Sequence, residues 1–113
     1  MLIQLPRAFR AEITLPTSKS ISARALILRA LCDTPCPLTA LSDSDDTRTM
    51  ETALEKVASD SQSEEPLLLD IGAAGTAMRF LTAFLATRVG KHFLLTGSQR
   101  MKQRPIAPLV EAL

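Results

Sequence analysis

The sequence predicts at most one domain, of the α/β or α+β class, because expected strands and helices alternate along it. Segments with the apolar runs or alternation of strands are interleaved with segments that have the 3.6-residue periodicity of helices. The composition, with 46% hydrophobic and 22% charged residues in a chain of 113, is typical of a globular protein. A turn with two glycines, Gly72-Ala73-Ala74-Gly75, joins one apolar run to the next helical segment.

The N-terminal part is expected to form short strands followed by a helix. Residues 2–5 and 11–15 are bounded by prolines and rich in strand-forming side chains, which predicts two short strands. Ser18 is a suitable N-cap for a helix over residues 19–31. That helix is apolar on most sides, and Ser22 and Arg29 mark its narrow solvent-facing stripe.

A short strand over residues 37–41 and a second helix over residues 47–58 are expected next. Either Ser44 or Asp45 can cap this helix, whose apolar and charged residues lie on opposite faces. The acidic run at 43–46 lacks the glycine and the distal glutamate of a calcium loop, so capping is favoured over metal binding. The second helix therefore begins with the acidic residues that a helix dipole prefers.

The C-terminal part begins, after a polar loop at 59–66, with an apolar run at 67–71 that predicts a buried strand. A third helix is expected over residues 76–88, followed by a turn and a strand within 89–96. Pro105 is interpreted as the first residue of a fourth helix, because proline is favoured at that position. The last residues continue that pattern without a C-cap, so we expect the chain to be part of a longer protein.

The composition disfavours several function classes. Lys and Arg nearly balance Asp and Glu, and neither Trp nor Tyr occurs, so no nucleic-acid partner is expected. Cys32, Cys36 and the single histidine, His92, have neither the number nor the spacing of zinc ligands, so no metal is expected. The sequence contains no apolar run that suits a membrane span or a signal peptide, which predicts a cytoplasmic protein without a membrane partner.

Cations cluster at the expected starts of three helices, where the helix dipole opposes positive charge by about 0.3–1 kcal/mol each. They are Lys19 and Arg24 in the first helix, Arg79 in the third, and Arg100, Lys102 and Arg104 ahead of the fourth. If these helix starts converge, their cations and free amide groups form one cleft that attracts a ligand with several negative charges.

Each of these features also has a plain structural interpretation. Arg24, with Ser20 one helical turn before it, could pair with a buried carboxylate while Lys19 is solvated. Gly75 would let an anion approach the free amide groups at the start of the third helix. The same turn could equally be a simple strand-to-helix connection, with Arg79 extended into solvent.

Four blocks of sequence together resemble the EPSP synthase family, the 3-phosphoshikimate 1-carboxyvinyltransferases. The blocks are "LPTSKSISARALILRAL" (15–31), "LSDSDDTRTM" (41–50), "GAAGTAMRFLTAFLA" (72–86) and "LTGSQRMKQRPIAPLVEAL" (95–113). The resemblance implies transfer of the enolpyruvyl group of phosphoenolpyruvate to the 5-hydroxyl of shikimate 3-phosphate in the shikimate pathway, without a metal or organic cofactor.

The resemblance also implies the fold, which has two domains of repeated βαβαββ units with the active site between them. The chain would be part of the N-terminal region of such an enolpyruvyl transferase (EPT/RTPC-like) fold. Residues 16–113 would belong to the N-terminal domain, and residues 1 to about 15 to strands that cross to the other domain. The remainder of the parent chain would be a partner, and the family's general acid/base carboxylates would lie in it, so this chain alone is not expected to catalyse.

Site residues follow from the same motifs, as implications of the resemblance. Lys19 would lie between the two substrates, and Ser20 and Arg24 would hold shikimate 3-phosphate. Gly75 and Arg104 would bind phosphoenolpyruvate. Weaker candidates are Thr76 and Arg79, which would support the loop or the phosphate, and Arg100.

Three residues depart from the family pattern. Ala73 stands where the family usually has Asn, Phe80 replaces a common Pro, and Ala23 replaces an Asn. The loss of the amide at Ala73 predicts altered sensitivity to glyphosate, a phosphoenolpyruvate mimic, without a changed reaction. Two rival interpretations stay open: the related UDP-N-acetylglucosamine enolpyruvyl transferases, which usually have Lys-Asn where this chain has Lys19-Ser20, and a non-catalytic anion-binding module.

Overall fold

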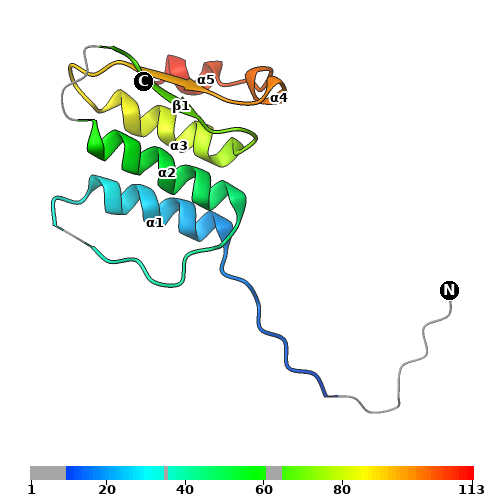
Figure 1. Ribbon diagram of the computed structural model, residues 1–113. Coiled ribbons are helices and arrows are strands. Elements are labelled where there is room, and N and C mark those ends of the chain that lie inside the picture. The colour runs from blue at the N-terminus through cyan, green and yellow to red at the C-terminus, as the bar shows by residue number, and fades with distance from the viewer. Residues whose placement is uncertain (1–9, 35, 61–64) are drawn as a thin grey trace.

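The structure is a computed structural model that describes residues 10–34, 36–60 and 65–113 (Figure 1). This part of the chain contains five helices and two strands. They are α1 (Lys19–Leu31), α2 (Asp45–Ser59), β1 (Leu67–Asp70), α3 (Gly75–Ala86), β2 (Phe93–Thr96), α4 (Gln99–Lys102) and α5 (Ala107–Glu111). The mixture of helices with a small parallel sheet confirms the α/β class at this level.

The strands β1 and β2 are neighbours and run parallel, with α3 as the connection between them. Their register pairs Leu67 with Phe93 and Leu69 with Leu95, and these residues pack towards the core. Leu68 and Leu94, which are also paired, point to the other face and are more than half exposed. One face of the sheet is therefore covered by helices, as a βαβ unit requires.

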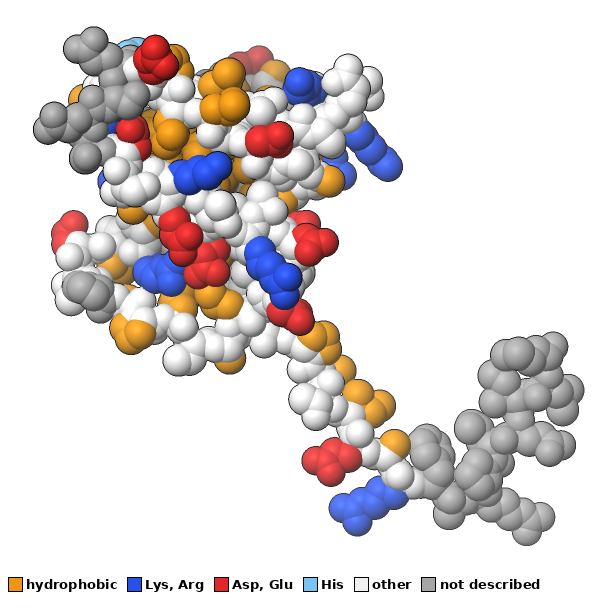
Figure 2. All heavy atoms as spheres, viewed as in Figure 1, with side chains coloured by type: hydrophobic (Ala, Val, Ile, Leu, Met, Phe, Trp, Pro, Cys, Tyr) orange, Lys and Arg blue, Asp and Glu red, His pale blue; other side chains and the backbone are white. Residues whose placement is uncertain are grey.

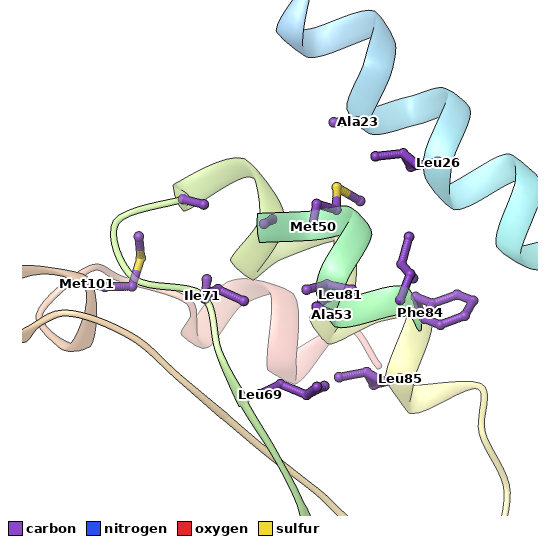
Figure 3. Close-up of a cluster of buried hydrophobic side chains, with 13 residues drawn as sticks. Ala23, Leu26, Met50, Ala53, Leu69, Ile71, Leu81, Phe84, Leu85 and Met101 are labelled. Atoms are coloured by element: carbon purple, nitrogen blue, oxygen red, sulfur yellow. The ribbon is translucent and has the colours of Figure 1, made fainter. Parts of the chain in front are cut away.

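The core lies between the three long helices and the covered face of the sheet (Figure 3). Leu26 of α1, Met50 of α2 and Leu81 of α3 are each at most 1% exposed. Ile71, directly after β1, is fully buried beside them. Complete burial of such a side chain contributes about 1.5–3 kcal/mol, so these residues account for the close packing of α1, α2 and α3.

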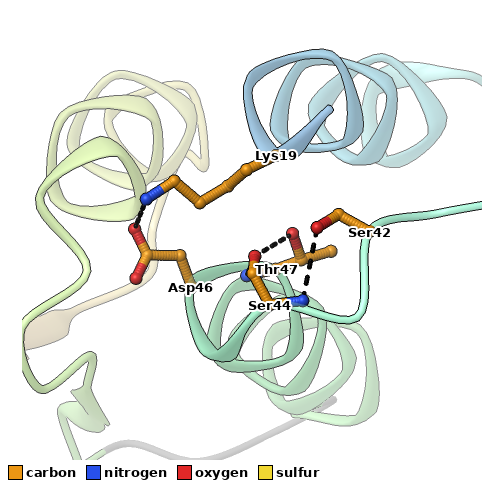
Figure 4. Close-up of polar contacts among 5 residues, drawn as sticks. All are labelled: Lys19, Ser42, Ser44, Asp46 and Thr47. Carbon is orange, nitrogen blue, oxygen red and sulfur yellow. Dashed lines mark hydrogen bonds and ion pairs between the residues drawn. The ribbon is translucent and has the colours of Figure 1, made fainter. Parts of the chain in front are cut away.

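Serine side chains cap three of the five helices in the described part of the chain. Ser18, Ser44 and Ser98 each accept a hydrogen bond from a backbone amide in the first turn of α1, α2 and α4. The predicted cap of α1 is confirmed, and Ser44 rather than Asp45 caps α2. The Ser44 hydroxyl also forms a hydrogen bond with the Thr47 hydroxyl at 3.0 Å, which stabilises the same turn (Figure 4).

Ser22 was expected on the solvent-facing stripe of α1, and this expectation is wrong. Its side chain is 1% exposed, and its hydroxyl accepts a 2.8 Å hydrogen bond from the backbone amide of Ser42. The bond joins α1 to the segment that enters α2, so Ser22 belongs to the helix–helix interface. Arg29, the other residue of the expected stripe, is half-buried and pairs with Glu51 of α2 at 3.3 Å, so it too faces the neighbouring helix.

Two predicted strands within the described residues do not form. Residues 11–15 are exposed and have no strand neighbour, and they lead away from the helices as part of an extended arm (Figures 1 and 2). A strand needs a partner for its backbone groups, and the structure provides none there. In residues 37–41 the positive φ of Ala40, 56°, breaks the extended conformation. The predicted strand at 2–5 lies outside the described residues.

The end of the chain also differs from the expectation. Pro105 does not open a helix; α5 begins at Ala107, with Ile106 as its N-cap and Pro108 within its first two positions. The short helix α4 was not predicted, and its single turn contains Arg100 and Lys102. In a helix of four residues the first and last turns coincide, so the helix dipole neither favours nor opposes these two cations clearly.

The third helix is shifted relative to its predicted range, since α3 runs from Gly75 to Ala86. None of the helices in the described ranges is long and apolar enough to cross a membrane.

Candidate anion-binding site

A cleft of about 380 Å³ lies where the start of α1, the start of α3 and the α4–α5 connection meet. Its lining consists of Ser20, Arg24, Gly75, Thr76, Arg79, Phe80 and Arg104. Six of these seven residues are candidates from the sequence, and they come from three segments separated by about fifty and twenty-five positions. The predicted convergence is therefore found for Arg24 and Arg79, which lie near helix starts, and for Arg104, which lies in the connection between α4 and α5.

Arg24 lies on the exposed side of α1 and is oriented by two neutral groups. Its Nη1 donates a 2.9 Å hydrogen bond to the backbone carbonyl of Ser20, one turn earlier in the same helix. Its guanidinium carbon lies 5.9 Å from the centroid of the Phe80 ring, which belongs to α3. Within the described residues Arg24 is exposed and pairs with no carboxylate, so the alternative of a buried ion pair is not found there.

Arg79 and Arg104 approach each other's segments across the cleft. Nη2 of Arg79 donates to the carbonyl of Pro105 at 3.4 Å, a bond from α3 to the α4–α5 connection. In the opposite direction, the guanidinium of Arg104 lies where a β-carbon on Gly75 would be. Because Gly75 has no side chain, Arg104 can approach the first residue of α3 this closely.

No carboxylate is among the described residues that line this cleft. The ion pairs within residues 10–34, 36–60 and 65–113 are Lys19–Asp46, Arg29–Glu51 and Lys91–Asp60, none of which involves a cleft arginine. The three guanidinium groups of the cleft thus keep their positive charge without a protein counter-ion in this part of the chain. Such a cluster attracts an anion with several charges.

The first turn of α3 adds backbone donors to the cleft. Its N-cap residue, Ala74, has no side-chain hydrogen bond to the helix. The amides of Gly75, Thr76 and Ala77 therefore lack the partner that a serine or aspartate would supply. A helix N-terminus of this kind, with arginines beside it, can bind a phosphate or a carboxylate.

The loops that carry these groups are joined at the carboxyl ends of the two strands. The amide of Ser98, after β2, donates a 2.8 Å hydrogen bond to the carbonyl of Gly72, after β1. A β-carbon on Gly97 would lie 2.5 Å from the same carbonyl, so this close approach requires glycine at that position.

Lys19 and Arg100 are not among the residues that line the cleft. The Nζ of Lys19 lies 2.9 Å from a carboxylate oxygen of Asp46, in the first turn of α2 (Figure 4). Lys19 is thus paired, neither free in solvent nor in the cleft. Arg100 lies in the short helix α4, outside this lining.

Cations at the opposite ends of the helices, by contrast, are matched by acceptors. Arg88 donates to the carbonyl of Ala30 at 3.1 Å and lies over the Phe84 ring at 4.3 Å. The Nζ of Lys91 donates to the backbone carbonyl of Asp60 at 3.1 Å and lies 3.5 Å from the Asp60 carboxylate. These contacts stabilise the carboxyl ends of α1 and α2, where the helix dipole is negative.

Phe80 is the one residue of the lining that was not proposed as a site residue from the sequence. In the sequence, Phe80 stands out only as one of the three departures from the family pattern. The spacing of four between Thr76 and Phe80, on one side of a helix that begins at the cleft, was an available signal. Within the described ranges, no group of three or more His, Cys, Asp or Glu side chains could hold a metal ion.

Comparison with known proteins now identifies the family. The profile of the EPSP synthase (3-phosphoshikimate 1-carboxyvinyltransferase) family matches residues 3–113. A 3-phosphoshikimate 1-carboxyvinyltransferase of Bacteroides fragilis (strain YCH46) is 50% identical over 112 residues, which are 99% of this chain and 25% of that protein. The protein of the same name from Opitutus terrae is 39% identical over 95% of this chain and 29% of its own length.

A longer relative has the same similarity. The pentafunctional AROM polypeptide of Candida glabrata is 41% identical over 96% of this chain, which corresponds to 8% of that protein. No solved structure matches the chain. The chain spans about a quarter of the length of the bacterial relatives. Because the family profile covers nearly all of it, the chain belongs to the EPSP synthase family.

Proposed function

We propose that this chain forms one wall of the active site of a 3-phosphoshikimate 1-carboxyvinyltransferase. The parent enzyme would transfer the enolpyruvyl group of phosphoenolpyruvate to the 5-hydroxyl of shikimate 3-phosphate and release phosphate, with the cytoplasm as its expected compartment. The observation that carries the proposal is the cleft lined by Arg24, Arg79 and Arg104 without a carboxylate. The names of the relatives support the same reaction.

The chemistry needs such a cleft because both substrates carry a phosphate and a carboxylate. Two polyanions repel each other, so their reacting atoms approach only if cations screen the charges. In this proposal Ser20 and Arg24 hold shikimate 3-phosphate, while Gly75 and Arg104 hold phosphoenolpyruvate with support from Thr76 and Arg79. Lys19 would reach the substrates by leaving Asp46, and Arg100 stays a weaker candidate.

The ionisable side chains of the described lining are all arginines, which are not among the residue types that usually act as general acids or bases. The proton transfers that accompany addition and elimination would therefore use groups outside this lining. We propose that the remainder of the parent chain supplies them, in an enolpyruvyl transferase fold of repeated βαβαββ units. The observed β1-α3-β2 unit, in the N-terminal domain over 16–113, would be part of one such repeat.

Isothermal titration calorimetry of this chain tests the proposal with shikimate 3-phosphate, phosphoenolpyruvate and UDP-N-acetylglucosamine. We expect shikimate 3-phosphate to bind and Arg24→Ala to weaken its binding about tenfold or more, as the loss of a hydrogen bond to a charged group does. Preference for the UDP-sugar would favour the related transferase instead. Equal binding of any phosphate, irrespective of its carbon skeleton, would indicate a simple anion-binding module.

A further inference from the structure

We infer that Phe80 is a positioning residue for Arg24, and that its ring holds the Arg24 guanidinium over the anion-binding cleft. The expected effect on substrate binding rests on the proposed function, whereas the contact between Phe80 and Arg24 is seen without any substrate. Phe80 is not a sequence candidate for the site. The structure places it in the cleft, because α1 and α3 meet there and bring Phe80 next to Arg24.

The contact joins two elements that are far apart in the sequence. Arg24 is in the second turn of α1, and Phe80 is in the second turn of α3. Both side chains line the cleft, and the guanidinium carbon lies 5.9 Å from the ring centroid. This distance is within the range of about 6 Å over which an aromatic face attracts a cation.

Arg24 differs from the other two arginines of the cleft in what holds its side chain in place. Arg79 is tied to the carbonyl of Pro105, and Arg104 lies against the backbone of Gly75, so each has a partner on a different segment. The hydrogen bond of Arg24 goes to Ser20, in its own helix. The Phe80 ring is therefore the partner that fixes Arg24 relative to α3.

The ring also suits the chemistry of the cleft. A carboxylate in place of Phe80 would neutralise Arg24 and compete with an anionic ligand, whereas an aromatic face orients the guanidinium and leaves its charge available. Phe80 is half-buried and packs against the core, so its ring is held by the interior of the protein. The packing of Phe80 against the core thus restricts the motion of the exposed Arg24 side chain.

Two measurements on the 113-residue chain test the inference. The first is the NMR order parameter of the Arg24 Nε–H bond without ligand, which reports how restricted the guanidinium is. The second is the affinity for shikimate 3-phosphate by calorimetry. Phe80→Leu is expected to lower the order parameter and to weaken binding about two- to fivefold, whereas Phe80→Tyr, which keeps an aromatic face, retains both.

The chain offers a matched control in the Arg88–Phe84 pair, at the other end of α3. The Arg88 order parameter should stay unchanged in both Phe80 variants, which separates a local effect from a general loosening of the helix. In an Arg24→Ala background, Phe80→Leu should have no further effect on affinity.

The outcomes separate this inference from the proposed function. An Arg24 order parameter that is the same in the wild type and in Phe80→Leu would overturn the inference, whatever binds. Equal affinity of the two proteins for shikimate 3-phosphate would overturn it as well. If the wild type does not bind shikimate 3-phosphate at all, the proposed function fails for this chain, and the order parameter alone decides whether Phe80 positions Arg24.

Discussion

The guanidinium of Arg104 occupies the space beside Gly75 that any other residue would fill with its β-carbon. This contact brings the α4–α5 connection against the first residue of α3, where the helix amides are free of side-chain caps. The position of one arginine thus depends on the absence of a side chain elsewhere.

Gly75→Ala is therefore expected to displace Arg104 and to weaken phosphoenolpyruvate binding about tenfold or more, with little change in stability. The clash involves the end of a flexible side chain, which can move at low cost. Calorimetry and thermal unfolding measure the two effects. Gly90→Ala is the control: Gly90 has a φ of 73°, and an added β-carbon would meet nothing within 4 Å, so the substitution should cost about 1 kcal/mol of stability and no affinity. Unchanged affinity in Gly75→Ala would contradict the prediction.

Asp46→Asn should release Lys19 at a small cost in stability. The Lys19 and Asp46 side chains are 49% and 29% exposed, and such pairs contribute about 0–1 kcal/mol. We expect a loss of about 1 kcal/mol or less in urea unfolding, together with tighter binding of phosphoenolpyruvate, because a freed Lys19 adds positive charge near the cleft. Asp45→Asn, in the same helical turn, is the matched control. Weaker binding in Asp46→Asn would show that Asp46 supports the site.

Ser22→Ala should destabilise the protein by about 1–3 kcal/mol, because the buried amide of Ser42 loses its acceptor. Ser20→Ala, two positions away, is exposed and should leave stability nearly unchanged. Denaturant unfolding of the two variants provides the comparison. A small effect for Ser22→Ala would mean that another group replaces the serine hydroxyl at the interface.

Leu81→Ala should cost about 2–5 kcal/mol of unfolding free energy, since the side chain is fully buried among α1, α2 and α3. Leu28→Ala tests the same chemistry at a position that is 63% exposed, and its effect should stay within about 0.5 kcal/mol. Similar losses at both positions would show that the outer face of α1 is covered by another surface in solution.

Ala73→Asn should restore an amide next to the start of α3. In the complete parent enzyme we expect this change to alter inhibition by glyphosate without altering the reaction. Ala73 is exposed, so the substitution should not disturb folding. Inhibition curves of the two enzymes decide the matter, and identical curves would refute the prediction.

Local signals made much of the fold predictable. The bounds of α1 follow from the Ser18 cap and the apolar periodicity up to Leu31, and β1 follows from its apolar run. The missing strand at 11–15 shows the limit of such signals, because a strand exists only where another strand can pair with it. Nothing in its sequence revealed that Ala40 would adopt a positive φ.

Part of the site was predictable because positive charge near the N-terminus of a helix is unfavourable unless a ligand or an acid balances it. Arg24 and Arg79 lie near helix starts that lack acids, and the structure brings them together with Arg104. The pairing of Lys19 with Asp46 was not predictable, because the two residues meet through the packing of α1 against α2. The short helix α4 was not predicted, although Ser98 is a suitable cap for it, and the role of Arg100 in binding stays a prediction.

The hydrogen bond from Ser98 to Gly72 makes the segments after β1 and β2 a single mechanical unit. A ligand that displaces the Gly75 turn should also displace the segment that leads to Arg104, because the Gly72 carbonyl connects the two segments. Gly97→Ala, which would disturb this connection, should therefore weaken anion binding, although residues 72, 97 and 98 do not line the cleft.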